Sequence, residues 1–395
     1  MKDLSVEEAR GRMLALAGKV GSETLAIAAA FGRVLAETVI AARDQPPFDS
    51  SAMDGWAVAG PGEDFRIVGE SAAGHSYRTP LEPGDAVRIF TGAAAPDGST
   101  RVVIQEEAIR DGDRVKTPAA DDRSSFIRPR GGDFRAGQTL LQPGVRLDAW
   151  RIGLAAAAGR ASLKVARAID VVLLSTGEEI VAPGGSPGPD QIFDAGGPML
   201  SLLVARWGGG TVRTVRAGDD EAAIAASVAT ASEALIVTLG GASVGDHDLV
   251  KPALGRLGLE LSVETVRVRP GKPTWFGVLG DGRRVLGLPG NPASALVCAE
   301  LFLRPLLAAM QGGEPGPNLA SARLKSPMPA NSGREHWARA RLSSSDGALW
   351  AEPMGDQDSS LVKVFAESGA LIRRGIGAPV GAVGDVVDVL VLDRL

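Results

Sequence analysis

The stretch ALIVTLGGASVGDHD, residues 234–248, decides the fold class. An apolar run of strand length leads into a glycine-rich loop, and a helical pattern follows at residues 247–257. The same alternation recurs along the chain, with strand-like runs at residues 171–174, 211–215, 262–268 and 284–286 and helical patterns at residues 199–207, 220–231 and 292–310. Strands that alternate with helices predict a parallel α/β sheet with helices on both faces.

The part of the chain before this region has a different texture. Ser5 and Glu8 have the spacing of a capping box, which predicts a helix to about residue 16, and a second helix is expected at residues 24–39. Between residues 45 and 141, short β-type runs alternate with glycine and proline turns, as in a small all-β domain. The alanine-rich residues 147–163 predict a helix that packs back on the N-terminal helices, so the first domain is expected to be discontinuous.

The C-terminal part resembles a small separate domain. With 395 residues, the chain is long enough for about two to four domains. A glycine- and proline-rich linker at residues 312–317 is followed by short β runs at residues 335–342, 371–372 and 386–392. These runs predict a C-terminal β-domain.

Composition excludes several classes of protein. Apolar residues make up 45% and charged residues 23%, which excludes a disordered or fibrous protein, and a net charge of −5 argues against a nucleic-acid partner. Cys298 is the only cysteine, so no intramolecular disulfide or cysteine zinc site can form. No membrane span is expected, because Glu300 and Arg304 interrupt the most apolar stretch. The N-terminus lacks the apolar run of a signal peptide, and a cytoplasmic location is expected.

Three loops follow strands of the predicted sheet and are candidates for a ligand site. Ligands of open α/β sheets bind at the carboxyl ends of strands, where glycines let the backbone approach them closely. The alternative is that each loop is only a tight turn between strand and helix. The candidate binding residues in these loops are Ser175, Thr176, Gly177, Gly240, Gly241, Ser243, Pro289, Asn291 and Pro292.

Charged residues near these loops suggest a metal ion and an anion. Glu179 and Asp248 fall at strand ends and Asp219 near a third, and clustered carboxylates can hold Mg²⁺. The alternative for Asp219 is a plain role in the first turn of a helix. Cations at the 267–272 turn, Arg267, Arg269 and Lys272, suggest a bound oxyanion or phosphate, the alternative being a solvated hairpin. Arg334, Arg339 and Arg341 are weaker candidates, and Cys298 is expected in the core rather than as a nucleophile.

Six motifs in order carry a resemblance to a known family. They are PPFDSSAMDGWAV (46–58), RIFTGAAAP (88–96), STGEEI (175–180), GGASVGDHD (240–248), RPGKP (269–273) and GLPGNPASA (287–295). On these motifs the chain resembles, over nearly its whole length, the molybdopterin molybdenumtransferases of molybdenum-cofactor biosynthesis, which include the E domain of gephyrin.

The resemblance implies a multidomain α/β plus β protein. The expected parts are an extended helical domain (1–44 and 137–166), a β-domain inserted in it (45–136), an α/β molybdopterin-binding domain with a parallel-rich sheet (167–313) and a C-terminal β-barrel (316–395). It also implies a homodimer whose active site lies between the α/β domain of one subunit and the inserted β-domain of the other.

The resemblance further implies a reaction. Molybdenum from molybdate is inserted into the dithiolene of adenylylated molybdopterin, Mg²⁺ assists cleavage of the phosphoanhydride, and AMP and molybdenum cofactor are released. The positions that match the family's functional residues are Asp54, Thr91, Asp133, Glu179, Asp219 and Asp248, with Pro289 and Pro292 matching prolines that shape the pocket. We expect Glu179, Asp219 and Asp248 to organise Mg²⁺, Asp54 and Thr91 to reach the partner's site, and Arg334 with Ser359 or Ser360 to bind molybdate.

The chain departs from the usual family sequence at several loop positions. Gly132 and Gly196 replace polar residues, Thr100 stands in a different turn sequence, and Ser368 replaces an asparagine. These changes bear on substrate preference or rate rather than on the fold.

Two other functions remain open on the sequence. One is a diverged relative that binds the pterin as a carrier or scaffold without transferring metal, and the other is a molybdopterin adenylyltransferase. The expected partners are adenylylated molybdopterin, molybdate and a second copy of the chain, with the adenylyltransferase and the cofactor-receiving enzymes as further candidates.

Overall fold

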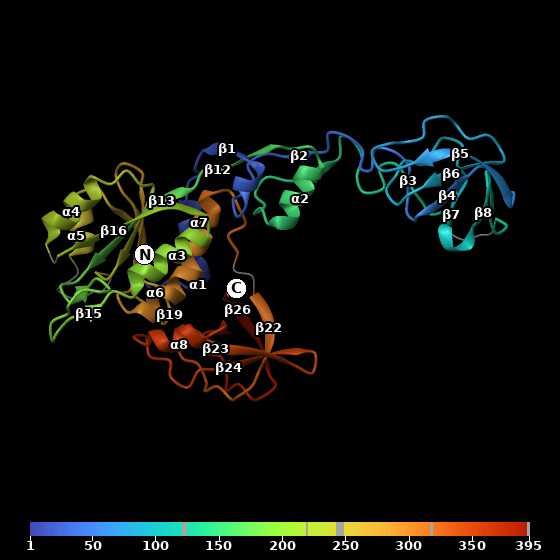
Figure 1. The fold of residues 1–395 in the computed structure, drawn as a ribbon. Helices are drawn as coiled ribbons and strands as arrows, with labels where there is room; N and C mark the ends of the chain where they lie inside the picture. Colours follow the sequence, from blue (N-terminus) through green and yellow to red (C-terminus); the bar gives the residue numbers. More distant parts are fainter. Residues whose placement is uncertain (121–124, 219, 242–248, 317–318, 393–395) are drawn as a thin grey trace.

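The chain folds into an elongated molecule. The structure is a computed structural model that describes residues 1–120, 125–218, 220–241, 249–316 and 319–392. The α/β part and the C-terminal β-barrel lie together at one end, and a narrow connecting part leads to a β-domain at the other end (Figure 1).

A six-stranded sheet forms the centre of the α/β part, in the order β16-β13-β17-β21-β20-β18. Its strands are β13 Ile169–Thr176, β16 Gly209–Ala217, β17 Leu235–Leu239, β18 Glu260–Val263, β20 Trp275–Val278 and β21 Arg284–Leu288. The first four strands in this order are parallel, whereas β20 is antiparallel to both of its neighbours. The sheet is therefore parallel-rich, and its antiparallel edge follows from the short turn between β20 and β21, which leaves no room for a crossover helix. The single strand predicted at residues 262–268 is wrong, because β18 and the short β19, Val268–Arg269, divide that stretch.

Helices cover both faces of this sheet, as the sequence predicts (Figure 1). They are α1 Val6–Ala15, α3 Gly196–Arg206, α4 Glu221–Ala229, α5 Val250–Gly255, α6 Pro292–Cys298 and α7 Arg304–Met310, with a π-helical turn at Ala299–Leu303 joining α6 to α7. Alternate side chains of β13 enter two cores, with Val171 and Leu173 facing α3 and α6 and with Val172 and Leu174 facing α4 and α5. Of the helices described, the continuous one over Pro292–Met310 is long and apolar enough to span a membrane, but 83% of its most apolar window is buried inside the protein.

The capping box at the N-terminus is confirmed. The backbone amide of Glu8 donates to the Ser5 hydroxyl, and the Glu8 carboxylate accepts from the Ser5 amide. Val6, Ala9 and Met13 of this helix share one core with the α/β sheet. Helix α1 therefore packs against the α/β part. The sequence had led us to expect residues 1–44 in the extended domain.

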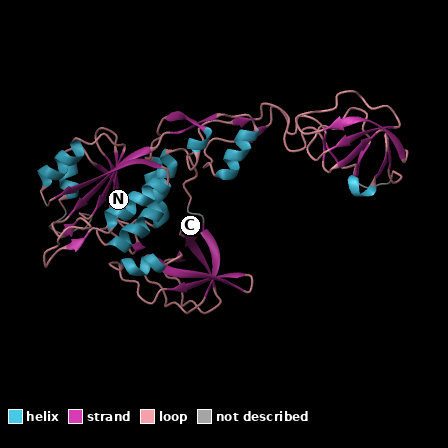
Figure 2. Cartoon of the chain, in the orientation of Figure 1, coloured by secondary structure: helices cyan, strands magenta, loops and turns pink. Residues whose placement is uncertain are grey.

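The connecting part contains more strand and loop than the sequence predicts (Figure 2). Its elements are β1 Ser22–Ala26, the 3₁₀ turn Ile27–Ala30, β2 Val39–Ile40, β11 Thr139–Leu141, α2 Ala149–Ala157 and β12 Ser162–Ala166. The helix expected at residues 24–39 is wrong, because β1 pairs with β12 and because Gly32 adopts a φ of 75° that interrupts a helix. Pairing of β1 with β12 and of β2 with β11 brings the two halves of the chain together around the inserted domain.

The inserted β-domain is confirmed as an all-β unit. A six-stranded sheet in the order β7-β4-β6-β5-β9-β8 forms most of it, and a two-stranded pair, β3 with β10, lies beside it. The strands are β3 Ser50–Ser51, β4 Gly55–Val58, β5 Asp64–Ser71, β6 Asp85–Ile89, β7 Arg101–Ile104, β8 Ile109–Asp111, β9 Arg114–Lys116 and β10 Ile127–Arg128. The 3₁₀ turn Gln105–Glu107 follows β7.

The C-terminal domain is a closed barrel of five strands in the order β23-β24-β22-β26-β25, closed by pairing of β25 with β23. Its elements are β22 Leu319–Leu324, β23 Glu335–Ser345, β24 Ala348–Pro353, α8 Val362–Glu367, β25 Ala370–Arg374 and β26 Val386–Val391. Strand β19 of the α/β part pairs with β23, which attaches the barrel to the loop at residues 267–273.

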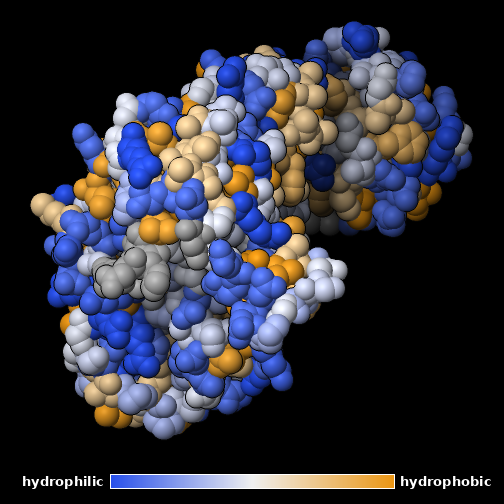
Figure 3. Space-filling model, turned by 90° about the vertical axis from the view of Figure 1, so that its left-hand side faces the viewer, coloured by the Kyte–Doolittle hydropathy of each residue, from blue (hydrophilic) through white to orange (hydrophobic). Residues whose placement is uncertain are grey.

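On the face drawn in Figure 3, hydrophobic residues lie in scattered spots over a largely hydrophilic surface. Two short strands, β14 Ile180–Val181 and β15 Ile192–Phe193, form a separate pair beside the carboxyl end of β13. This pair carries the chain away from the sheet and back to it, which places residues 192–196 beside the three predicted loops.

Candidate active site

A large cavity of about 1370 Å³ opens between the carboxyl ends of the sheet strands and the β-barrel. The strands β13, β17 and β21 each end at this cavity, as expected for an open α/β sheet. Of the predicted site residues, those that line the cavity are Ser175, Thr176, Glu179, Gly240, Gly241, Arg269, Lys272, Pro289, Asn291, Pro292, Arg334, Ser359 and Ser360. The described residues of the three loops therefore lie around one cavity with residues of the 269–273 turn; residues 242–248 of the second loop lie outside the described residues.

Other predicted residues do not line the cavity. Gly177 is not among the lining residues; it has a φ of 122°, and a Cβ there would come within 2.4 Å of the Glu179 carboxylate. Arg267 is exposed, and its backbone bridges Leu4 and Glu335 rather than facing the cavity. Ser243, Asp219 and Asp248 lie outside the described residues.

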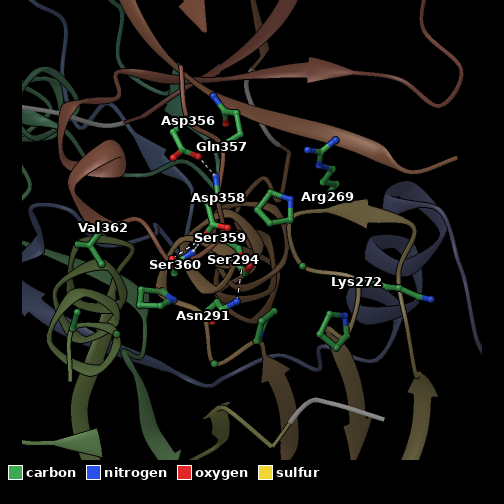
Figure 4. Close-up of a pocket in the computed structure, with 18 of the residues that line it drawn as sticks. Arg269, Lys272, Asn291, Ser294, Asp356, Gln357, Asp358, Ser359, Ser360 and Val362 are labelled. Atoms are coloured by element: carbon green, nitrogen blue, oxygen red, sulfur yellow. Dashed lines mark hydrogen bonds between the residues drawn. The ribbon is translucent and has the colours of Figure 1, made fainter. Parts of the chain in front are cut away.

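The barrel closes the cavity through one loop, residues 354–360. The side-chain amide of Asn291 donates to the Ser359 hydroxyl at 2.9 Å, and the Ala293 amide donates to the Ser359 carbonyl at 3.1 Å. Ser360 donates from its amide and hydroxyl to Asp358 at 2.8 and 2.6 Å, and these bonds lower the pKa of the Asp358 carboxyl. Figure 4 shows Ser359 and Ser360 above Asn291 and Ser294, with Arg269 and Lys272 nearby.

Arg339 on β23 holds this loop in place. Its side chain is fully buried, and it donates from Nε to Gln357 Oε1 at 3.2 Å and from Nη1 to the Asp358 carbonyl at 3.0 Å. The Gln357 amide donates in return to the Arg339 carbonyl at 2.9 Å. From the sequence, Arg339 was only one of three candidate arginines in the barrel. Because it lies two residues after Trp337 on β23, both side chains point to the same, buried face of the strand.

The cavity wall on the barrel side has a cationic part, which lies beside the Asp356 and Asp358 carboxylates of the 354–360 loop. His336 lines it together with Arg269, Arg334 and Arg374. Burial, and then these arginines with Arg339, lower the pKa of His336 to about 4, so the ring is neutral at pH 7. The cavity is therefore suited to an anion that is held by arginine rather than by histidine.

The unfolding free energy of the protein should fall as pH falls from about 6.5 to about 4, because the unfolded state gains a proton on His336 that the native state excludes. The expected contribution is on the order of 1 kcal/mol per pH unit in that range. His336→Gln should make the unfolding free energy depend less on pH in this range. His75→Gln is the control, because His75 is exposed and its loss should leave the pH dependence unchanged. Urea unfolding at several pH values measures the slope, and equal slopes in the two variants would contradict the assignment.

At the sheet edge of the cavity, a buried carboxylate and a buried hydroxyl without a hydrogen bond could act as ligands of a hard cation. Asp194 is buried; its Oδ1 accepts from the Gly197 amide at 2.8 Å, while Oδ2 lacks a hydrogen bond and lies 3.7 Å from Arg216. The Ser175 hydroxyl is also buried without a hydrogen bond. Among the residues that the structure describes, no group of three or more His, Cys, Asp or Glu side chains forms a metal cage. Two of the three predicted metal ligands lie outside those residues.

Asp54 and Thr91 lie together in the inserted β-domain, which Figure 1 shows at the opposite end of the molecule from the α/β part and the barrel. Asp54 Oδ1 accepts from the Thr91 amide at 2.7 Å and from its hydroxyl at 2.8 Å. These bonds, with a smaller effect of Arg88, lower the pKa of the Asp54 carboxyl. Asp133 sits in a separate turn of the inserted domain, where its amide donates to the Gln45 carbonyl at 2.9 Å.

The departures from the family sequence fall in different places. Gly196 lines the cavity, beside Asp194. Gly132 stands in the turn of Asp133, where its amide donates to the Pro129 carbonyl. Thr100 bonds the Val58 carbonyl within the inserted domain, and Ser368 is buried and bonds the Val364 carbonyl at the end of α8. Only the Gly196 change alters the described wall of the cavity.

Cys298 is a core residue, as expected. Burial raises the pKa of its thiol to about 12, although the Thr274 hydroxyl donates to the sulfur at 3.1 Å. The sulfur of Cys298 lies against Gly271 of the 269–273 turn. A Cβ at position 271 would come within 2.1 Å of this sulfur, so only glycine fits there. The cysteine therefore supports the cavity floor rather than acting as a nucleophile.

Three family profiles match successive parts of the chain. Residues 4–159 match the MoeA N-terminal region (domain I and II), residues 172–309 a probable molybdopterin binding domain, and residues 321–392 the MoeA C-terminal region (domain IV). Curated relatives include a molybdopterin molybdenumtransferase of Haemophilus influenzae, 32% identical over 93% of this chain and 94% of its own length. Another is molybdopterin molybdenumtransferase 2 of Mycobacterium tuberculosis, 35% identical over 82% and 84%. The solved molybdopterin biosynthesis MoeA protein of Pyrococcus horikoshii is 28% identical and covers 100% of both chains with a TM-score of 0.80.

Proposed function

The chain belongs to the molybdopterin molybdenumtransferase family, and we propose that it inserts molybdenum from molybdate into adenylylated molybdopterin with release of AMP. One observation carries this proposal most directly. The cavity of about 1370 Å³ combines glycine-rich strand ends, a cationic wall and the Ser359–Asn291 closure. A polyanion with a planar ring system needs this combination of backbone donors, arginines and room.

We propose a division of the cavity between the two substrates. Backbone and hydroxyl groups at Ser175, Thr176, Gly240 and Gly241 suit the pterin and phosphate groups, because they lie at the carboxyl ends of parallel strands. Molybdate, a tetrahedral dianion, suits the barrel side, where Arg334 and the Ser359 hydroxyl can donate to it, whereas both donors of Ser360 are bonded to Asp358. Arg269 and Lys272 lie between the two regions and suit the phosphoanhydride.

We propose that Mg²⁺ binds at the sheet edge of the cavity, held by Glu179 with Asp219 and Asp248. Two buried oxygens without a hydrogen bond, Asp194 Oδ2 and the Ser175 hydroxyl, support a site for a hard cation there, although Asp194 Oδ2 also lies 3.7 Å from Arg216. Bound Mg²⁺ would neutralise charge on the anhydride. The residues of the chain itself orient the anhydride, through Arg269 and Lys272, and exclude bulk water by closing the Ser359 loop over α6.

We further propose that the protein works as a homodimer in the cytoplasm. Asp54 and Thr91 belong to the inserted β-domain, which lies at the opposite end of the molecule from the α/β part and the barrel (Figure 1), so an action on the cavity requires a second copy of the chain. Among the described residues outside the inserted domain, the large apolar side chains that are strongly exposed include Trp150 at 86%, Leu202 at 74% and Phe31 at 66%. Large apolar side chains with such exposure are typical of surfaces that are covered in an assembly.

Trp150→Lys should weaken self-association at least ~10-fold, because a central aromatic side chain contributes strongly to a protein interface. Analytical ultracentrifugation measures the monomer–dimer equilibrium. Val386→Lys is the matched control, since Val386 is 65% exposed but lies on β26 of the barrel, which does not line the cavity. Equal association of the two variants would exclude Trp150 from the interface.

The experiment for the activity follows the product. The protein, adenylylated molybdopterin, molybdate and Mg²⁺ are incubated, and the mixture is added to a molybdoenzyme that lacks its cofactor. Activity of that enzyme is the expected result. Tight pterin binding without reconstitution would favour a carrier, and ATP-dependent adenylylation of molybdopterin would favour an adenylyltransferase; the curated relatives do not favour either alternative.

A further inference from the structure

A second cavity, of about 330 Å³, lies where the connecting part joins the α/β part. Two linkers form much of its wall: residues 17–21, between α1 and β1, and residues 167–168, between β12 and β13. The Arg167 amide donates to the Gly21 carbonyl at 2.8 Å, and the Val20 amide donates to the Met310 carbonyl at 2.9 Å. These bonds hold the two linkers to each other and to the end of α7.

This cavity is separate from the candidate active site. Strand β13 begins beside it at Ile169 and ends at the large cavity with Thr176. Its eight residues span about 25 Å in extended form. The second cavity therefore lies at the opposite edge of the same sheet.

Positive charge predominates around the second cavity. Lys19, Arg167 and Arg284 line it, against the single carboxylate of Asp170. The Asp170 carboxylate already accepts a hydrogen bond from the Thr211 amide at 2.7 Å. The nearby Glu23 carboxylate forms an ion pair with Arg33 at 2.6 Å, and Arg167 makes a smaller contribution to lowering its pKa. Within the described parts of the chain, neither Lys19, Arg167 nor Arg284 has an ion pair.

Arg284 is fixed in position at the edge of the cavity. Its Nε donates to the Leu16 carbonyl at 3.1 Å, at the C-terminus of α1. A terminal nitrogen of Arg284 lies against Gly18, where a Cβ would come within 2.0 Å of that nitrogen. Gly18 also has a φ of 67°, which favours glycine at this position. A guanidinium that is preorganised in this way loses little entropy when it binds an anion.

The remaining wall of the cavity is mostly apolar, although it also includes Ser232. Val20, Ile169, Ala234 and Met310 line it. The volume is about ten times that of one water molecule, which exceeds what a bare phosphate ion fills. The cavity therefore offers a cationic end for a phosphate group and an apolar wall for a flat ring.

We propose that this cavity binds a phosphomonoester of nucleotide size, a nucleoside monophosphate, and that the ligand bridges Arg284 of the α/β part to Lys19 and Arg167 of the two linkers. Binding would stiffen the junction that carries the inserted domain. This site goes beyond the proposed molybdenum transfer and does not depend on it, since none of its residues lines the large cavity.

Hydrogen–deuterium exchange of the full chain with AMP, or with inorganic phosphate, tests the proposal. AMP should slow exchange of the backbone amides in residues 17–21 and 167–169. The double variant Lys19→Gln/Arg167→Gln should need at least ~10-fold more AMP for the same protection at this junction, while protection around residues 239–241 and 289–293 stays unchanged. Arg12→Gln/Lys164→Gln removes two exposed charges from the neighbouring elements and should behave like the wild type.

The inorganic phosphate arm separates the two possible sources of the phosphate group. Inorganic phosphate should protect the junction only at concentrations at least ~10-fold above those of AMP, because it leaves the apolar wall uncovered. Equal potency of the two ions would overturn the nucleotide assignment. Absence of junction protection by AMP, or protection that the double variant leaves intact, would overturn the site itself.

Discussion

Asp54→Asn is expected to slow molybdate-dependent AMP release at least ~10-fold while the fold and the dimer remain intact. The asparagine oxygen can still accept both hydrogen bonds from Thr91, at 2.7 and 2.8 Å in the wild type. What disappears is the negative charge, which the lowered pKa of Asp54 keeps in place at neutral pH. A structural role would survive this change, whereas an electrostatic or proton-handling role would not.

Single-turnover AMP release from protein loaded with adenylylated molybdopterin measures the effect. Asp64→Asn is the control, because it removes the same charge from an exposed ion pair with Arg114 in the same domain. The control should release AMP within about twofold of the wild type, as expected for an exposed pair. Unchanged release in Asp54→Asn would remove Asp54 from the mechanism.

Mixed dimers extend the same experiment to the shared site. Asp54→Asn carries its defect in the inserted domain, and Lys272→Met would carry one in the large cavity. If each site combines the two parts from different subunits, co-expression of the variants should restore about a quarter of the wild-type sites. Release no higher than that of the separate variants would show that both residues serve the same site within one chain.

Arg339→Met is expected to raise the KM for molybdate at least ~10-fold and to cost about 2 to 4 kcal/mol of unfolding free energy. Methionine fills much of the buried volume, but it leaves the Asp358 carbonyl without its donor at 3.0 Å and weakens the hold on Gln357. Ser359 then loses its fixed position over Asn291. Because molybdate is proposed to bind at Ser359, its KM should change more than the rate at saturation.

Arg341→Met is the matched control for Arg339. It lies two residues further along β23, where it pairs with Glu367, and its side chain is 55% exposed. Its loss should cost less than about 1 kcal/mol and leave the KM for molybdate unchanged. A stability loss in Arg339→Met without a change in KM would make Arg339 a structural residue only, and molybdate binding would then not depend on the loop.

The α/β part was predictable because its signals are local. Each apolar run of residues 171–174, 234–238 and 284–286 falls in a strand, and the loops after them meet at one cavity. Parallel strands bring their carboxyl ends to one edge, so strand order is not needed to group these loops. The antiparallel β20 went unpredicted, since nothing in its four residues marks a hairpin.

The connecting part and the barrel loop were less predictable because their structure depends on distant partners. Residues 24–39 have helical composition, but β1 gains its hydrogen bonds from β12, more than a hundred residues away. Arg339 and Gln357 carry no motif, and their importance follows only from how the barrel docks on α6. Asp54 and Thr91 were paired through a resemblance between motifs, and the structure brings the two side chains into contact.

The most direct measurement is AMP release from the purified protein loaded with adenylylated molybdopterin and Mg²⁺, before and after molybdate is added. Little release without molybdate and rapid release with it is the predicted result, because the cationic barrel wall and the sheet edge then act on both substrates together. Release at the same rate with and without molybdate, or no release at all from tightly bound substrate, would contradict molybdenum transfer as the function of this chain.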